Sequence, residues 1–276
     1  MLKEQVIIIG GGPAGVACAV QLKRYGIDPL LLEKNSIGGL VRNAWRLDNY
    51  PGFPDGISGE ELAVKIKAHL ERFDIRYSIC DIRYSNYFNG QFVLQSNEKE
   101  YICKYLVVAS GTKAKYVVPG NEATFFTEVF PLRGMKGMSI AIVGAGDAAF
   151  DYAMTLSTHN DVHIFNRGSR IKCVPALLEI AKKQEKISYH ENSVPSDSFD
   201  YTIFATGREA ELGYLSPELE ENCQQLEKQG LLYIIGDVKN GRVRQVSVAT
   251  GDGIRAAMAI REKILEDESN QQDTGT

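Results

Sequence analysis

Two glycine-rich turns, one at the start of the chain and one near its middle, constrain the fold most strongly. Gly10–Gly15 reads GGGPAG, and Gly144–Ala149 reads GAGDAA. Each turn follows a short β-branched run (Val6–Ile9 and Ile140–Val143) and opens into a helix-like stretch, which is the context that a G-x-G-x-x-G/A dinucleotide turn requires. The glycines allow a tight turn and close approach of a pyrophosphate to a helix N-terminus. The sequence therefore predicts two dinucleotide sites, an arrangement typical of electron transfer between cofactors.

The residue that ends the second strand of each unit indicates which dinucleotide is bound. In the first unit that residue is Glu33, and a carboxylate there accepts hydrogen bonds from a free ribose 2′-hydroxyl, as in FAD or NAD. In the second unit the strand Asp161–Phe165 runs into Asn166 and Arg167, with Arg170 and Lys172 just beyond. Cations suit a 2′-phosphate, so the second site favours NADPH. NADH stays open, because the same cations can form a solvated loop.

Composition sets several classes of protein aside. Of the 276 residues, 44% are hydrophobic and 24% are charged, which is typical of a globular α/β protein. The net charge of −4 comes with no long Lys/Arg block, so we expect no nucleic-acid partner. No apolar run is long enough for a membrane span, and Glu4 and the first glycine turn argue against a signal peptide in Met1–Val20. We expect a cytoplasmic protein.

The five cysteines are isolated in the sequence: Cys18, Cys80, Cys103, Cys173 and Cys223. They form no C-x-x-C and have no neighbouring histidine cluster, so we expect no metal site and no local redox pair. A buried small hydrophobe is the default role of each. Cys173, beside Arg170 and Lys172, has the most electropositive setting for a reactive thiolate.

The chain is organised as two similar halves. Each runs from a glycine turn through a βαβ unit to a strand that exits in a small-residue turn, at Gly111 and at Gly207. This pattern predicts an α/β fold of two Rossmann-like, three-layer dinucleotide-binding domains with parallel sheets, the second inserted into the first. We expect the boundaries near Tyr116–Gly120 and Gln229-Gly230, giving domains of 1–116 with 230–276 and of 117–229. We also expect a hairpin turn at Phe88–Gln91 and a closing helix at Asp252–Glu266.

Further strings occur in order along the chain: Gly38-Gly39-Leu40, Asn49-Tyr50-Pro51-Gly52-Phe53, Gly236-Asp237-Val238 and Arg244-Gln245. With these strings the chain resembles the low-molecular-weight thioredoxin reductase-like flavoproteins over nearly its whole length. The resemblance implies FAD in the outer domain and a nicotinamide cofactor in the inserted one.

The turns and the resemblance together give two sets of expected cofactor contacts. In the FAD domain they are Gly10, Gly12, Pro13, Ala14, Gly15, Glu33, Gly39, Leu40, Asn49, Gly111, Gly236, Asp237, Arg244, Gln245 and Val246. By resemblance, Asp237 binds the ribityl chain and Arg244, Gln245 and Val246 approach the isoalloxazine ring. In the NAD(P)H domain they are Gly144, Gly146, Asp147, Ala148, Asn166, Arg167, Arg170 and Gly207.

Two departures from the family pattern bear on function. Thioredoxin reductases carry a C-x-x-C shortly before the second glycine turn, whereas Phe125–Gly137 contains no cysteine. Over Phe125–Asp151 the chain is instead similar to the ferredoxin-NADP reductases of the thioredoxin reductase type, and somewhat to bacillithiol disulfide reductases. The stretch Ile187–Tyr201 is also too short for the β-meander usual in the nicotinamide domain, so that domain is shortened.

The expected activity is hydride transfer from NAD(P)H to the flavin, followed by electron transfer to an external acceptor, either a ferredoxin-like protein or a small molecule. The cofactors carry this chemistry, so no catalytic side chain is named. The resemblance implies a homodimer. One alternative is a thiol or disulfide oxidoreductase that uses a single cysteine such as Cys173, or a different electron donor. Another is a non-catalytic flavin- or nucleotide-binding sensor or subunit.

Overall fold

The computed structural model describes residues 2–115, 124–196 and 198–273. The chain divides into two compact units. The first unit consists of Met1–Val41, Leu62–Thr112 and Ala210–Thr276, and the second consists of Arg42–Glu61 and Lys113–Glu209. Each unit contains one of the two glycine turns.

The first unit is built on a sheet with the strand order β3-β2-β1-β6-β5-β4, in which β14 also pairs with β6. Strand β1 runs parallel to both β2 and β6, and β14 runs parallel to β6. The strands are β1 Leu2–Ile9, β2 Leu30–Glu33, β3 Tyr77–Ile79, β4 Ile82–Phe88, β5 Gln91–Ser96, β6 Glu100–Val108 and β14 Leu232–Ile234.

The predicted hairpin is confirmed. Asn89 and Gly90, with φ of 49° and 80°, connect β4 and β5. Residues with positive φ at both central positions suit a two-residue hairpin turn. The hairpin joins β6 antiparallel, so this sheet is mixed, where we expected a parallel one.

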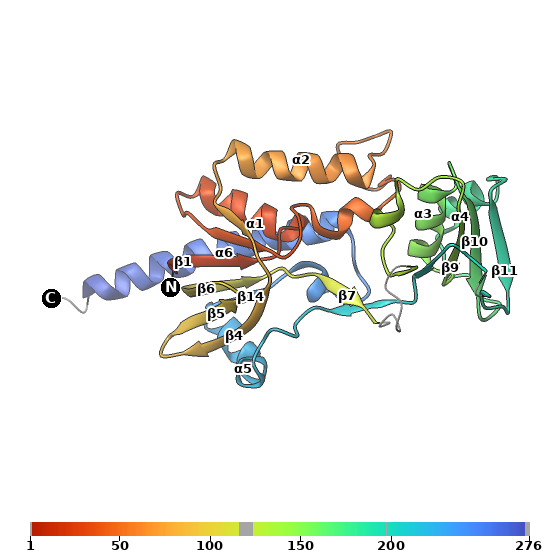
Figure 1. Cartoon of the computed structure of the whole chain (residues 1–276). Helices are drawn as coiled ribbons and strands as arrows, with labels where there is room; N and C mark the ends of the chain where they lie inside the picture. Colours follow the sequence, from red (N-terminus) through yellow and green to blue (C-terminus); the bar gives the residue numbers. More distant parts are fainter. Residues whose placement is uncertain (1, 116–123, 197, 274–276) are drawn as a thin grey trace. The chain divides into compact units, whose positions relative to one another are not determined.

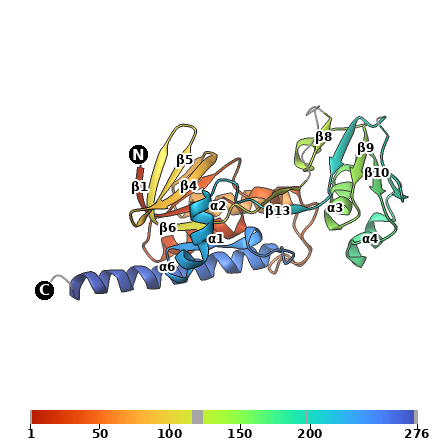
Figure 2. The ribbon, with the colours of Figure 1, turned by 90° about the horizontal axis from the view of Figure 1, so that it is seen from below.

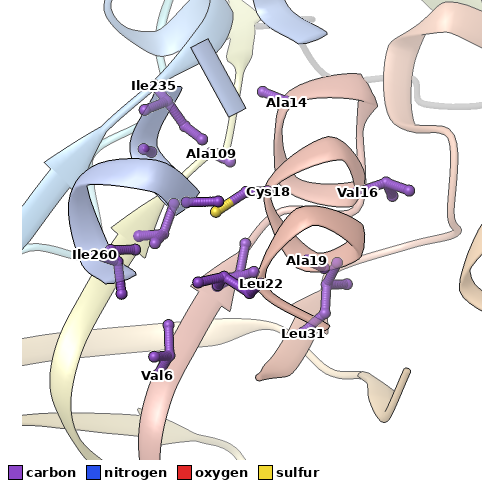
Figure 3. Close-up of a cluster of buried hydrophobic side chains, with 14 of the residues drawn as sticks. Val6, Ala14, Val16, Cys18, Ala19, Leu22, Leu31, Ala109, Ile235 and Ile260 are labelled. Atoms are coloured by element: carbon purple, nitrogen blue, oxygen red, sulfur yellow. The ribbon is translucent and has the colours of Figure 1, made fainter. Parts of the chain in front are cut away.

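Helices cover both faces of the first sheet (Figure 1). Helices α1 (Pro13–Arg24), α2 (Gly59–Arg72) and α6 (Val246–Asp273) lie on one face, and α5 (Pro217–Lys228) lies on the other. Figure 3 shows the apolar cluster in which Cys18 and Leu22 of α1 meet Ile260 of α6.

Helix α6 begins earlier and ends later than the expected Asp252–Glu266. Gly251 and Gly253 lower the helix propensity of its first turns, which is why the sequence indicated a later start. In the structure Gly253 permits close packing, because a Cβ there would collide with the Ala14 carbonyl oxygen and lie 2.9 Å from the Cys18 nitrogen. Burial against α1 therefore outweighs the weak local propensity.

The chain returns to the first unit at Ala210 rather than at Gln229-Gly230. The reason is α5, whose Leu219 and Leu226 are buried in the first unit's core. In addition, the Ser85 nitrogen donates to the Tyr214 carbonyl at 2.7 Å. The chain leaves the first unit briefly for Arg42–Glu61 and crosses again between Thr112 and Lys113, whereas the expected boundary at Tyr116–Gly120 lies outside the described residues.

The second unit contains a five-stranded parallel sheet with the order β11-β10-β9-β12-β8. Its strands are β8 Phe125–Phe126, β9 Ser139–Val143, β10 Asp161–Asn166, β11 Ile187–Glu191 and β12 Tyr201–Phe204. Helices α3 (Asp147–Leu156) and α4 (Pro175–Ala181) pack on it through a second apolar core (Figure 2). Strands β7 (Thr112–Ala114) and β13 (Arg208–Ala210) pair separately where the chain passes between units. Within the described ranges, every helix is too short or too polar to cross a membrane.

Candidate functional site

The first glycine turn joins β1 to α1 and is shaped by backbone contacts. Gly10 has a φ of 110°, and a Cβ on it would collide with the carbonyl oxygen of Ala109 at the end of β6. A Cβ on Gly15 would collide with the Gly10 carbonyl oxygen. These two glycines therefore serve the packing of strand, turn and helix.

Gly12 has a different role, because it is the N-cap of α1 and faces open space. Nothing lies within 4 Å of a Cβ built on it, and no side chain caps the helix. The first N–H groups of a helix have no partner inside the helix, and they favour an anion there. Pro13 fits the first helical position, where no N–H is needed. The end of α1 is thus accessible to a phosphate group.

Glu33 ends β2 beside this turn and is 8% exposed. Its Oε2 accepts the Gly11 N–H at 2.6 Å, and its Oε1 accepts the Asn35 N–H at 2.8 Å. Each carboxylate oxygen has two acceptor positions, so one on each oxygen stays available for a ribose hydroxyl. The carboxylate both fixes the turn and fits an adenosine ribose.

The fold brings several other predicted residues to the same end of the sheet. Gly39 begins the short helix η1 (Gly39–Asn43), and a Cβ on it would lie 3.3 Å from the Gly12 Cα. Gly236 begins η3 (Gly236–Val238), and a Cβ on it would lie 2.8 Å from the Ala14 Cβ. Leu40 follows Gly39, and Asp237 follows Gly236. The glycine turn, η1 and η3 thus converge on the start of α1.

The remaining predicted contacts of this site fall in different places. Gly111 lies just beyond β6, whose Val108 pairs with Ile9 next to the glycine turn. Arg244 and Gln245 precede α6, and Val246 is its first residue. Asn49 belongs to the second unit, so the structure does not place it in the first-unit site.

The second glycine turn repeats this design between β9 and α3. A Cβ on Gly144 would lie 2.5 Å from the carbonyl oxygen of Ala205, which follows β12 two residues before Gly207. Gly146 is the N-cap of α3, with no capping side chain and nothing within 4 Å of a Cβ. Asp147 and Ala148 are exposed in the first turn of α3. The second helix start is accessible as well.

The Asn166 side chain organises the loop after β10. Its Nδ2 donates to the Arg170 carbonyl at 3.2 Å and to the Tyr189 hydroxyl at 2.8 Å, while its Oδ1 accepts the Gly168 N–H at 3.2 Å. Both amide N–H groups are therefore occupied within the protein. Asn166 shapes the loop that carries the two arginines and keeps little bonding capacity for a ligand.

The same loop brings cations to the second turn. Arg167, Arg170 and Lys172 are exposed, and within the described residues they form no ion pair. The backbone N–H of Lys172 donates to the Ala145 carbonyl at 2.8 Å, and the backbones of Lys172 and Gly146 form an isolated parallel β-bridge. The sequence placed Lys172 among the cations of this loop without naming it as a contact, and its backbone pairing with the turn has no signal in the sequence.

The interpretation of Cys173 as the most electropositive thiol is wrong. Burial and the neighbouring Asp147 carboxylate raise the pKa of Cys173 to about 12. Asp147 lies close by because its Oδ1 accepts the Val174 N–H at 2.7 Å. Cys18, Cys103 and Cys223 also have pKa values raised by burial. These four thiols are poor nucleophiles at neutral pH.

A half-buried carboxylate, Asp151 of α3, holds the 42–61 segment within the second unit. Its Oδ2 accepts the Trp45 N–H at 2.8 Å. Next to it, the Arg133 guanidinium donates to the Ala44 carbonyl at 2.9 Å and to Glu60 at 3.1 Å. Burial raises the pKa of Asp151 to about 6, although the Trp45 N–H and Arg133 favour the charged form. The fold therefore carries a carboxyl group with a pKa well above that of an exposed aspartate.

This pKa predicts a pH-dependent stability. The unfolded carboxyl has a pKa of 3.8, so between pH 3.8 and about 6 the folded chain binds more protons than the unfolded one. The Asp151 contribution to the free energy of unfolding thus falls by up to about 3 kcal/mol across this range as the pH rises. In urea unfolding, D151N should gain that amount relative to the wild type between pH 4 and pH 7. A difference that is constant with pH would contradict the raised pKa.

Comparison with known proteins agrees with the two-site geometry. The model of the pyridine nucleotide-disulphide oxidoreductase family matches residues 4–198, well over half of the chain. The chain belongs to this family. It is therefore an oxidoreductase, and both glycine turns lie within the matched region.

Thioredoxin reductases are among the relatives of this oxidoreductase. The Bacillus subtilis enzyme is 27% identical over 300 residues, covering 95% of this chain and 95% of its own. Because that alignment is longer than the 276 residues here, it includes segments with no counterpart in this chain. The Arabidopsis thaliana NADPH-dependent thioredoxin reductase 3 is 27% identical over 89% of this chain and 48% of its own.

Solved structures show the same fold. Lactococcus lactis thioredoxin reductase superimposes with a TM-score of 0.82 at 22% identity, covering 95% of this chain and 99% of its own. The Staphylococcus aureus bacillithiol disulfide reductase gives a TM-score of 0.72 at 17% identity, covering 95% and 99%. The α/β fold with two Rossmann-like domains, one inserted into the other, is thereby confirmed.

Proposed function

We propose that this oxidoreductase binds FAD in the first unit and NADPH in the second, and that it passes electrons from the flavin to an acceptor outside the chain. The observation that carries the proposal is the pair of helix N-termini at Gly12 and Gly146. Both are open and uncapped, and each lies where a parallel pair of strands ends. Ligands of open α/β sheets bind at that edge.

Membership of the family and the thioredoxin reductase relatives support FAD as the first cofactor. Glu33 would hold the adenosine ribose, the start of α1 the pyrophosphate, and Asp237 the ribityl chain. Arg244, Gln245 and Val246 would lie at the ring. When bound, the flavin accepts a hydride from reduced nicotinamide and releases electrons to an acceptor. The chain's contribution is to bind and orient, and no side chain is required to move a proton.

The second unit favours NADPH over NADH. Arg167, Arg170 and Lys172 form no ion pair within the described part of the chain, and Lys172 is hydrogen-bonded through its backbone to the glycine turn. Guanidinium and ammonium groups bind a 2′-phosphate through charge-assisted hydrogen bonds. The Arabidopsis relative is named as an NADPH-dependent enzyme, which also supports NADPH as the nucleotide of the second unit.

The arrangement of the cysteines supports electron transfer to an acceptor outside the chain. They are distant from one another in the sequence, with no C-x-x-C to relay electrons to a disulfide partner. The raised pKa of Cys173 removes the main support for a single-cysteine thiol reductase. A ferredoxin-like protein or a small molecule is thus the proposed acceptor, and a cytoplasmic homodimer is the proposed form of the enzyme.

The test is anaerobic mixing of the purified protein with NADPH or NADH while the flavin band near 450 nm is followed. We expect bleaching by NADPH, with NADH slower at equal concentration, and an unchanged rate in C173S. Bound flavin that neither nucleotide bleaches would contradict NAD(P)H oxidation and favour a different donor or a non-catalytic flavoprotein. The thiol route is tested in turnover with NADPH: loss of disulfide reduction in C173S, with dye reduction retained, would restore it.

A further inference from the structure

One carboxylate outside the predicted contacts, Asp252, holds the turn that follows β14. Asp252 lies in the second turn of α6, and its side chain is 17% exposed. Its Oδ2 accepts the Gly236 N–H at 3.2 Å and the Asn240 Nδ2–H at 2.7 Å. A single oxygen thus ties both ends of the Gly236–Asn240 turn to the helix.

That turn is in contact with the first glycine turn. Gly236, with a φ of 73°, lies so close to Ala14 that a Cβ on it would be 2.8 Å from the Ala14 Cβ. Gly253, the neighbour of Asp252, packs against the Ala14 carbonyl from α6. Ala14 in α1 is therefore held between two glycines whose relative placement depends on the Asp252 side chain.

Alternative roles of Asp252 are weaker. Its ion pair with Arg255 joins Oδ1 to a nitrogen 3.9 Å away on a side chain that is 83% exposed, so this pair contributes little. By contrast, a hydrogen bond to a carboxylate with low exposure is worth more than a neutral one. The geometry points to the turn, rather than to the surface, as the purpose of the charge.

We infer that Asp252 is a positioning residue of the flavin site. By fixing Gly236 and Asn240 it sets Asp237 and the start of α1 at one separation, so that the ribityl chain and the pyrophosphate are held together. The inference rests on the proposed binding of FAD in the first unit. It assigns Asp252 no contact with the cofactor.

The test compares FAD affinity of apoprotein from the wild type, D252A, D252N and N240A. We expect D252A to weaken FAD binding by about 10- to 100-fold, because two hydrogen bonds to one acceptor are lost. D252N should lose less affinity than D252A, since an amide oxygen accepts from the same two donors but lacks the charge that strengthens each hydrogen bond. The exposed neighbour provides the matched control, so R255A should bind FAD as the wild type does.

A second readout separates positioning from loss of fold. In D252A the visible flavin bands and the flavin fluorescence yield should shift, while the far-ultraviolet circular dichroism stays unchanged. If D252A does not fold, N240A should still show a weaker effect in the same direction. Wild-type affinity and spectrum in D252A, or in N240A where D252A is unfolded, would overturn the inference. A wild-type chain that takes up no FAD would overturn both this inference and the proposed function.

Discussion

Gly12→Ala should leave the chain folded and lower its affinity for FAD by about 100-fold or more. The added methyl group meets no protein atom within 4 Å, and the backbone at Gly12 (φ −76°, ψ −175°) is one that any residue adopts. The methyl group would, however, occupy the space through which a pyrophosphate reaches the N–H groups of α1. Losing two charge-assisted hydrogen bonds accounts for the expected size of the effect. Flavin content after purification and titration of apoprotein with FAD measure it.

Gly15→Ala is the matched control, because it adds the same methyl group three residues later. That methyl would collide with the Gly10 carbonyl oxygen, so the expected cost is in stability, about 1–3 kcal/mol in urea unfolding of the apoprotein. Gly12→Ala should therefore lower the affinity for FAD, whereas Gly15→Ala should lower the free energy of unfolding. A Gly12→Ala protein that retains FAD at wild-type affinity would contradict the assignment of this turn to the pyrophosphate.

The second large effect is expected from the cations beside the other turn. In the double variant R167A/K172A the affinity for NADPH should fall by about 100-fold, because each charge-assisted hydrogen bond contributes about 1.5–3 kcal/mol. The affinity for NADH, which has no 2′-phosphate, should change much less. The concentration of each nucleotide that gives half-maximal flavin bleaching measures both.

Lys183 supplies the control for this prediction, since it is an exposed cation of the same unit just after α4. K183A should retain the wild-type preference for NADPH. Equal losses of NADPH and NADH affinity in R167A/K172A would mean that these cations contact a group common to both nucleotides, such as the pyrophosphate. An unchanged NADPH affinity would place the 2′-phosphate elsewhere.

The sequence by itself determined the two dinucleotide turns and the residues that shape them. Glycine is required at Gly10 and Gly15 because any Cβ would collide with backbone, and such local constraints are visible in a string of letters. The acid at Glu33 and the basic loop at Arg167 also follow from short-range spacing within one βαβ unit. For this reason the fold class, the family and the positions of both helix starts were predicted correctly.

Only the tertiary structure decided which segments complete each unit. Leu219 and Leu226 place α5 in the first unit's core, and the half-buried acceptor Asp151 contacts the 42–61 segment, which includes Asn49, within the second unit. The pKa of Cys173 is raised because the fold buries the thiol and also sets Asp147 beside it, although its sequence neighbours are basic. The backbone of Lys172 is hydrogen-bonded to Ala145, 27 positions away, and Asp252 accepts hydrogen bonds from Gly236 and Asn240, 16 and 12 positions away. Burial and long-range hydrogen bonding depend on packing between distant segments, and no local pattern of residues encodes them.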